Sequence, residues 1–160
     1  MKKSWQDKLQ DKATLPKILK LEEGFPCFKA VHKMGVEVGD DVILVNPSEV
    51  VAEMQQVPEG KLITIVEICN KIAKKHHVKG CCSLTTGIFI MTAANAVEEA
   101  KSEGKQLNIP YWRTLKTDGF LNPKYPGGQE AHKKLLEQEG HQIISKGKHF
   151  LVRNYQLYLT

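Results

Sequence analysis

A capped, amphipathic helix in the middle of the chain is the feature that most constrains the fold. Thr64 and Glu67 form the Thr-x-x-Glu pattern of a capping box, in which each side chain binds a free backbone N–H group at a helix start. Behind this box, apolar residues recur at helical spacing and form one face: Ile65, Ile68, Cys69, Ile72 and Ala73. The pattern predicts a helix that packs its apolar face on another element.

Helices are also predicted on both sides of this one. Asn46 is a good N-cap and Pro47 suits the first helical position, so a helix is predicted from there to about Gln56. A third helix is predicted to start near residues 84–86 and to run to about Ser102. Two successive helices joined by a short connection that contains glycine are typical of a helix-turn-helix.

The two ends of the chain supply the remaining elements. A helix over Ala131–Glu139 and a hairpin of residues 142–145 and 149–152 are predicted near the C-terminus, the hairpin serving as a wing. A short helix over Ser4–Lys12 and a strand over Val42–Val45 are predicted near the N-terminus. We therefore predict an α+β, mainly helical fold, with a winged helix-turn-helix domain over residues 46–160 and a short N-terminal extension over residues 1–45.

The charge of the chain favours polyanionic partners. Its 160 residues carry a formal net charge of +5, and the sequence pI is about 9.0, so contacts to phosphate groups are electrostatically favoured. No apolar run approaches the roughly 20 residues that cross a bilayer, and the N-terminus lacks the apolar segment of a signal peptide. We expect a cytoplasmic protein that has no membrane partner and whose four cysteines are thiols.

The most specific motif lies between residues 109 and 128. Ile109–Arg113 reads Ile-Pro-Tyr-Trp-Arg, and Asp118–Gly119 and Tyr125–Gly128 (Tyr-Pro-Gly-Gly) follow. This frame resembles the active-site segment of the methylguanine-DNA methyltransferases, in which Pro-Cys-His-Arg leads into a Tyr-x-Gly-Gly loop. Tyr111 stands at the cysteine position and Trp112 at the histidine position. The chain is therefore most similar to the alkyltransferase-like proteins, which lack the active-site cysteine.

The resemblance covers about residues 47–145 and implies both a fold and a partner. It implies a winged-helix DNA-binding domain of the alkyltransferase type that binds double-stranded DNA, extrudes an alkylated guanine into a pocket and marks it for a repair-protein partner. No cofactor, metal or catalytic residue is expected. The residues that it implies for the lesion pocket or the DNA contact are Tyr111, Trp112, Arg113, Asn95, Thr92, Tyr125, Gly127, Gly128 and Lys133.

The tyrosine at the cysteine position argues against alkyl transfer. Transfer from the guanine oxygen needs a soft nucleophile, such as a thiolate whose pKa a histidine and a carboxylate have lowered. A phenol with a pKa of about 10 is mostly protonated at neutral pH and is a poorer nucleophile toward carbon. Glu139 corresponds to the carboxylate that orients the histidine in the enzymes, so with Trp112 in the histidine position we expect this relay to have no middle member.

Several departures from the family pattern oppose a simple transfer of function. Ile65 replaces a tyrosine that presses on the DNA backbone, and Asn95 replaces the arginine that fills the space of the extruded base. Glu98 and Glu99 replace a glycine pair and would bring carboxylates toward phosphates. An alternative hypothesis is therefore a repurposed winged-helix module that binds a protein or a small ligand.

Some residues allow more than one interpretation. Cys27, in a Pro-Cys-x-Lys segment, could be a displaced nucleophile with His32 beside it, but such a cysteine is more often a small core residue. The pairs His76–His77 and Cys81–Cys82 could suggest zinc, but adjacent residues point apart, and we favour two buried thiols.

The third helix also has two faces to assign. One stripe is predicted to pack in the core: Phe89, Ala93, Ala96, Val97 and Ala100. The other face is predicted to be exposed, either to the minor groove or only to solvent: Thr92, Asn95, Glu99 and Ser102.

Overall fold

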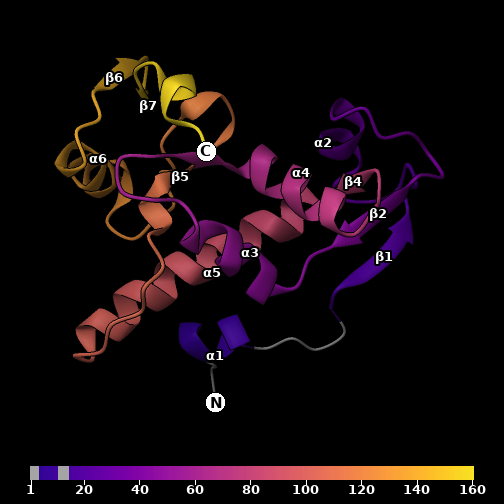
Figure 1. The fold of residues 1–160 in the computed structure, drawn as a ribbon, viewed down its shortest axis with the longest axis horizontal. Coiled ribbons are helices and arrows are strands. Elements are labelled where there is room, and N and C mark those ends of the chain that lie inside the picture. Colours follow the sequence, from indigo (N-terminus) through magenta and orange to yellow (C-terminus); the bar gives the residue numbers. More distant parts are fainter. Residues whose placement is uncertain (1–3, 11–14) are drawn as a thin grey trace.

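A long helix, α5 (Ser83–Ser102), forms the centre of the computed structural model, which describes residues 4–10 and 15–160 (Figure 1). The helices α1 (Trp5–Gln10), α3 (Pro47–Gln55) and α4 (Ile65–Lys75) pack against it, as does the short 3₁₀ turn η1 (Tyr111–Arg113). Four alanines of α5 are fully buried and let these neighbours approach closely: Ala93, Ala94, Ala96 and Ala100.

The predicted helix starts are confirmed. The side chain of Asn46 accepts a 2.9 Å hydrogen bond from the N–H group of Ser48 at the start of α3. At the start of α4, Thr64 accepts from the N–H group of Glu67 at 3.4 Å, and Glu67 accepts from that of Thr64 at 3.0 Å. The helix α5 begins at Ser83, one residue before the predicted range. The predicted N-terminal helix is α1, and its last two predicted residues lie outside the described residues.

A three-stranded sheet joins the N-terminal region to the helix pair. Its strands are β1 (Lys17–Lys20), β2 (Asp41–Leu44) and β4 (Gly80–Cys81), in the order β1-β2-β4. The strand β2 runs antiparallel to β1 and parallel to β4. It confirms the strand predicted over Val42–Val45, shifted by one residue. The helix α2 (Phe28–Lys33) packs on this sheet through Val31, which is fully buried.

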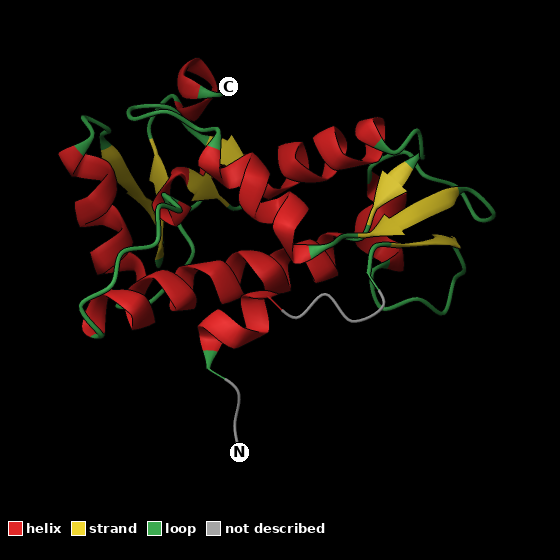
Figure 2. Ribbon diagram, turned by 60° about the horizontal axis from the view of Figure 1, so that its bottom comes forward, coloured by secondary structure: helices red, strands yellow, loops and turns green. Residues whose placement is uncertain are grey.

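The C-terminal part carries the predicted hairpin. The helix α6 (Gly128–Gln138) precedes β6 (Ile143–Lys146) and β7 (His149–Val152), which pair antiparallel. The sheet of β1, β2 and β4 and this hairpin lie at opposite ends of the molecule, with the long helices between them (Figures 1 and 2). The remaining short elements are β3 (Ile63–Thr64), which pairs in parallel with β5 (Thr114–Leu115), and the 3₁₀ turns η2 (Thr117–Gly119) and η3 (Tyr155–Tyr158).

The helix α6 begins three residues before its predicted start. Gly127 has φ 84°, a left-handed conformation, and a Cβ atom there would lie 2.6 Å from the Cβ atom of Ala131. Glycine at this position therefore lets the chain turn directly into the helix. The architecture as a whole is α+β and mainly helical. Within residues 4–10 and 15–160, no helix has the length and apolar character required to cross a bilayer.

Candidate nucleic-acid interface

Tyr111, at the cysteine position of the family frame, is almost fully buried, with an exposed fraction of 2%. Its hydroxyl donates a 2.9 Å hydrogen bond to the carboxylate of Glu98 on α5. Its ring makes edge contacts with the rings of Trp112 and Tyr125, at centroid distances of 5.5 and 5.1 Å. Burial, and then the carboxylate of Glu98, raise the pKa of Tyr111 above its usual value of about 10. The phenol is therefore protonated at neutral pH.

Glu139 gathers three segments around one carboxylate. It accepts hydrogen bonds from the indole nitrogen of Trp112 at 2.9 Å, from Nε of Arg113 at 3.0 Å and from the N–H group of Gly60 at 3.1 Å. A second guanidinium nitrogen of Arg113 lies 2.8 Å from it, and another donates to the carbonyl of Val57. Burial acts to raise the pKa of Glu139, but these donors outweigh it and hold the pKa below its usual value.

A hydrogen bond replaces the relay of the enzymes. Trp112 occupies the histidine position and donates to the carboxylate of Glu139. An indole N–H group is a donor only, so it cannot accept a proton and pass it on as a histidine does. Trp112 therefore keeps the connection to Glu139 but not its acid–base chemistry.

The Tyr-x-Gly-Gly loop is fixed by buried hydrogen bonds. The hydroxyl of Tyr125 donates to the carbonyl of Thr114 at 2.9 Å, and the N–H group of Gly128 donates to the carbonyl of Tyr125 at 2.8 Å. Tyr125 is buried, and burial raises the pKa of its phenol. The loop thus presents a rigid aromatic ring rather than a titrating group.

His132 is a site residue that the sequence analysis missed. Its Nδ1 accepts from the N–H group of Asn122 at 3.2 Å, so its Nε2 donates to the carbonyl of Trp112 at 2.7 Å. Its ring also lies 4.8 Å from that of Tyr125. Burial lowers the pKa of His132 to about 4. The sequence signal that could have identified His132 is its position one helical turn after Gly128, on the face of α6 that contacts Trp112.

The expectation of an exposed face on α5 is largely wrong. Thr92 is buried, and its hydroxyl donates to the carbonyl of Ile88 at 2.8 Å. Asn95 is half-buried and donates to the carbonyl of Met91 at 2.9 Å. Glu99 is also half-buried, and of the predicted face only Ser102 is exposed. The reason is that α1 covers α5, while the polar side chains bond back to their own helix.

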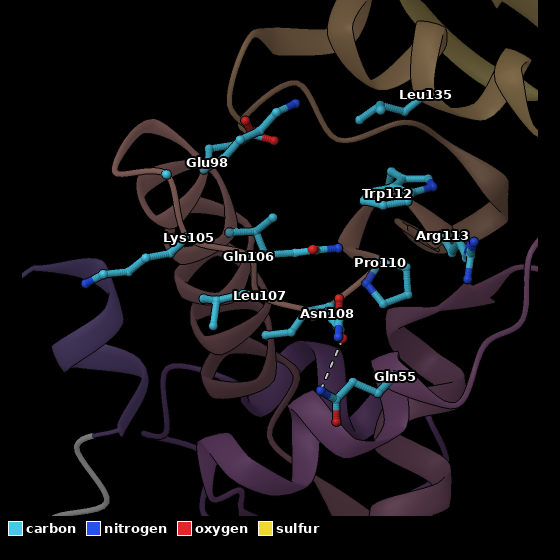
Figure 3. Close-up of a pocket in the computed structure, with 14 residues that line it drawn as sticks. Gln55, Glu98, Lys105, Gln106, Leu107, Asn108, Pro110, Trp112, Arg113 and Leu135 are labelled. Carbon is cyan, nitrogen blue, oxygen red and sulfur yellow. Dashed lines mark hydrogen bonds between the residues drawn. The ribbon is translucent and has the colours of Figure 1, made fainter.

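Four of the predicted site residues line two pockets. The first, here called the Trp112 pocket, has a volume of about 790 Å³ (Figure 3). Its charged or aromatic lining residues are Glu98, Lys101, Lys105, Trp112 and Arg113. On one wall, the side chain of Gln55 donates to the carbonyl of Asn108 at 3.2 Å (Figure 3). This pocket is therefore of mixed charge.

The second pocket, here called the Tyr125 pocket, has a volume of about 650 Å³. It is lined by the first half of α5, by the segment around β5, by Tyr125 and by parts of the N-terminal region. Lys116 and Lys124 lie on its lining, which includes no aspartate or glutamate among the described residues. Thr92 and Tyr125 thus line one pocket and Trp112 and Arg113 the other, with the ring of Tyr111 in contact with both Tyr125 and Trp112.

The other predicted site residues do not line either pocket. Asn95, Gly127 and Gly128 are not part of the lining of either pocket. Lys133 lies on α6, with its ammonium group 5.3 Å from the centre of the Phe150 ring on the hairpin.

Residues 47–141 match the family described as 6-O-methylguanine DNA methyltransferase, DNA binding domain. The chain belongs to this family. The family predicted from the frame around Tyr111 is thereby confirmed. A comparison with curated proteins finds no match.

Two solved structures resemble this DNA-binding-domain protein in fold. The first is an S. pombe ATL in complex with DNA, with a TM-score of 0.52 and 17% identity. The second is S. pombe Atl1 in complex with damaged DNA containing O6-carboxymethylguanine, with a TM-score of 0.50 and 20% identity. Each alignment covers 71% of this chain and 93% of the other. These likenesses confirm the predicted winged helix-turn-helix fold of the alkyltransferase type.

Glu98 and Glu99, which stand where the family resemblance implies a glycine pair, both accept hydrogen bonds from other parts of the chain. Glu98 accepts from the hydroxyl of Tyr111. Glu99 accepts from the N–H groups of Trp5 and Gln6 at 3.1 and 3.2 Å. Both carboxylates therefore hold other elements onto α5.

Cys27 is the cysteine that lies on the Tyr125 pocket. It is buried, and burial together with the neighbouring Cys82 raises the pKa of its thiol to about 12. The ring of His32 is engaged with other residues: its Nδ1 lies 3.1 Å from the carbonyl oxygen of Val36, and the ring stacks on Phe28. Cys27 thus has the environment of a core thiol.

Both cysteines and one of the two histidines considered for zinc are engaged by neighbouring side chains. Cys81 and Cys82 are buried free thiols, as favoured from the sequence. The sulfur of Cys81 lies 3.3 Å from the hydroxyl of Thr86, and His76 lies 2.7 Å from the carboxylate of Glu49.

Removing the charge of Glu139 is expected to destabilise the protein strongly. In Glu139→Gln, the guanidinium of Arg113 stays buried without a counter-ion, which costs about 3 kcal/mol. Urea unfolding measures the loss. The control is Asp41→Asn, which breaks an exposed pair with Lys20, and it should cost no more than about 0.5 kcal/mol. Equal losses in the two variants would show that Glu139 is not a structural centre.

The buried neutral His132 makes stability fall in mild acid. Its pKa is about 4 in the folded state and 6.5 as a free group, so the unfolded chain binds a proton first. The contribution is complete above pH 6.5 and is lost between pH 6.5 and 4, by up to about 3 kcal/mol. Urea unfolding across this range should give a steeper pH dependence for the wild type than for His132→Gln. Parallel curves would contradict the assignment.

Proposed function

We propose that this protein binds double-stranded DNA and receives an extruded, alkylated guanine in the Tyr125 pocket without removing the alkyl group. The observation that carries the proposal is membership of a DNA-binding-domain family over residues 47–141. The two similar solved structures are complexes with DNA, one of which contains O6-carboxymethylguanine. A lesion held in this way would be marked for other repair proteins.

The lining of the Tyr125 pocket suits a nucleotide. Ile65, Ile88 and Met91 offer apolar surface for the faces of a base. Lys116 and Lys124 are exposed cations on the same lining, where they can contact the phosphates on either side of that base. Because no carboxylate shares this lining in the described part of the chain, the approach of an anionic backbone is unopposed there.

The state of the available nucleophiles supports the proposed lack of alkyl transfer. The raised pKa of Tyr111 keeps its phenol protonated, and its hydroxyl proton is already donated to Glu98. The thiol of Cys27, with a pKa of about 12, holds very little thiolate at neutral pH. Neither group has the activated form that attack on an alkyl carbon requires.

The Trp112 pocket favours a second candidate function, the binding of a small ligand. Its volume of about 790 Å³ lies within the range of small-molecule sites, roughly 300–1,000 Å³. Glu98 lies on its lining together with Lys101 and Lys105, so both signs of charge are available. Such a lining suits a zwitterionic or neutral polar molecule better than the backbone of DNA.

The protein is expected to bind a duplex with a lesion more tightly than an undamaged one, and substitutions in the Tyr125 pocket are expected to weaken binding. Fluorescence anisotropy should give a lower Kd for a duplex with one O6-methylguanine than for the same duplex with guanine. Lys116→Glu with Lys124→Glu should weaken binding to both and reduce the slope of log K against log salt by about 2, because each lost phosphate contact removes about 0.9.

The matched control reverses two exposed lysines of the other pocket, Lys101→Glu with Lys105→Glu, and should change the affinity and the salt slope far less. A larger effect of this control would move the DNA contact to the Trp112 pocket. No binding of the wild type to either duplex at moderate salt would reject DNA binding in favour of the ligand-binding alternative.

Incubation with the methylated duplex should leave the mass of the protein unchanged. An unactivated phenol and a thiol with a pKa of about 12 do not attack the methyl group. Intact-mass spectrometry after prolonged incubation measures this, with an active methylguanine-DNA methyltransferase as the positive control. A gain of about 14 Da, the mass of the CH₂ added when methyl replaces a proton, would show that a nucleophile is active, and Cys27→Ser would then test which one.

A further inference from the structure

Trp5 lies in the N-terminal helix α1, outside the residues that match the family, yet it lines the Tyr125 pocket. We infer that Trp5 stacks on the nucleobase that enters this pocket and thereby sets the affinity for extruded bases. The inference rests on the proposed function, since it names a residue that holds the same ligand. Pro26, Cys27 and Ala30 also line this pocket, so the N-terminal region supplies four of its lining residues.

Hydrogen bonds to the helix α5 fix the position of Trp5. The carboxylate of Glu99 on α5 accepts hydrogen bonds from the N–H groups of Trp5 and Gln6. The side-chain amide of Gln6 also donates to Glu99 at 2.8 Å and to Glu103 at 3.2 Å. These donors, the Trp5 N–H group first, lower the pKa of Glu99. Leu9, one turn further along α1, packs against the central core. The helix is thus held at both ends on the element that also lines the pocket.

The ring of Trp5 is free enough to receive a base. Trp5 has an exposed fraction of 37%, so part of its side chain is accessible to a ligand. An exposed tryptophan at the mouth of an apolar pocket has the geometry of a stacking platform, because every base presents a π-face. Ile88, exposed by 54%, continues the same apolar lining from α5.

The charges around this ring favour a base that is attached to phosphate. The ammonium group of Lys8 lies 4.3 Å from the centre of the Trp5 ring. Lys116 and Lys124 lie on the pocket lining that Trp5 shares. An aromatic surface flanked by three cations fits an extruded nucleotide of a DNA strand better than an uncharged apolar molecule.

Trp112 is less suited to the same role, although it stands in the family frame. Its indole N–H group is already donated to Glu139, and its ring is in edge contact with the ring of Tyr111. It also lines the other pocket. The two tryptophans of the chain therefore have separate roles, one structural and one for the ligand.

The test follows both tryptophans in the full-length protein. Labelling with 5-fluorotryptophan gives one ¹⁹F resonance for each, and Trp5→Phe assigns them. Addition of the O6-methylguanine duplex should shift the Trp5 resonance more than the Trp112 resonance. In anisotropy, Trp5→Ala should weaken binding by about 5- to 150-fold, the equivalent of 1–3 kcal/mol per stacked base, and Trp5→Phe should retain part of the affinity.

The matched control is Leu157→Ala, which truncates another exposed apolar side chain, 72% exposed, and should leave the affinity unchanged. If the wild type binds the duplex but Trp5→Ala binds equally well and the Trp5 resonance does not move, the stacking role is overturned while DNA binding stands. If the wild type binds no duplex at all, the proposed function and this inference both fail. Circular dichroism of each variant separates loss of fold from loss of contact.

Discussion

The carboxylate of Glu139 is the interaction on which the candidate site depends. It joins the end of α6 to the Trp112–Arg113 turn and to the turn at Gly60. These three segments are distant in sequence, and their donors would be unpaired in the interior without this acceptor. Buried carboxylates are stable only when such donors surround them, so the three segments must take their positions together. The positions of Trp112 and Arg113, which line the Trp112 pocket, follow from that assembly.

The aromatic rings of Tyr111, Trp112 and Tyr125 connect this hydrogen-bonded centre to both pockets. Tyr111 is held against α5 by Glu98, and its ring makes edge contacts with Tyr125, which lines one pocket, and with Trp112, which lines the other. At the position where the enzymes of the family have a reactive thiol, this chain has the larger, protonated phenol of Tyr111, which lies between Tyr125 and Trp112. The two cavities on either side are therefore separate in chemistry as well as in space, one basic and one of mixed charge.

Local signals in the sequence predicted much of the fold. The caps at Asn46 and Thr64 depend on residues within one helical turn, and the hairpin around Gly147 depends on adjacent strands. The family frame made Tyr125 and Trp112 candidate pocket residues for the same reason, because its residues lie close together in sequence. The exposed face of α5 was predicted wrongly, since the helix that covers it comes from more than 90 residues away. No periodicity within α5 reports a partner at that separation.

The parallel pairing of β2 with β4 has a consequence for how this chain can be divided. The strand β4 lies in the connection between α4 and α5, and its partner belongs to the N-terminal region. A Cβ atom at Gly80 would lie 2.7 Å from the side chain of Val36, so the two parts fit closely. A fragment trimmed to residues 47–141 would leave the backbone edge of β4 open, and open edges promote association between copies. The borders of the family match are therefore poor places to cut the chain, and a transplantable version of this DNA-binding domain must carry its N-terminal sheet with it.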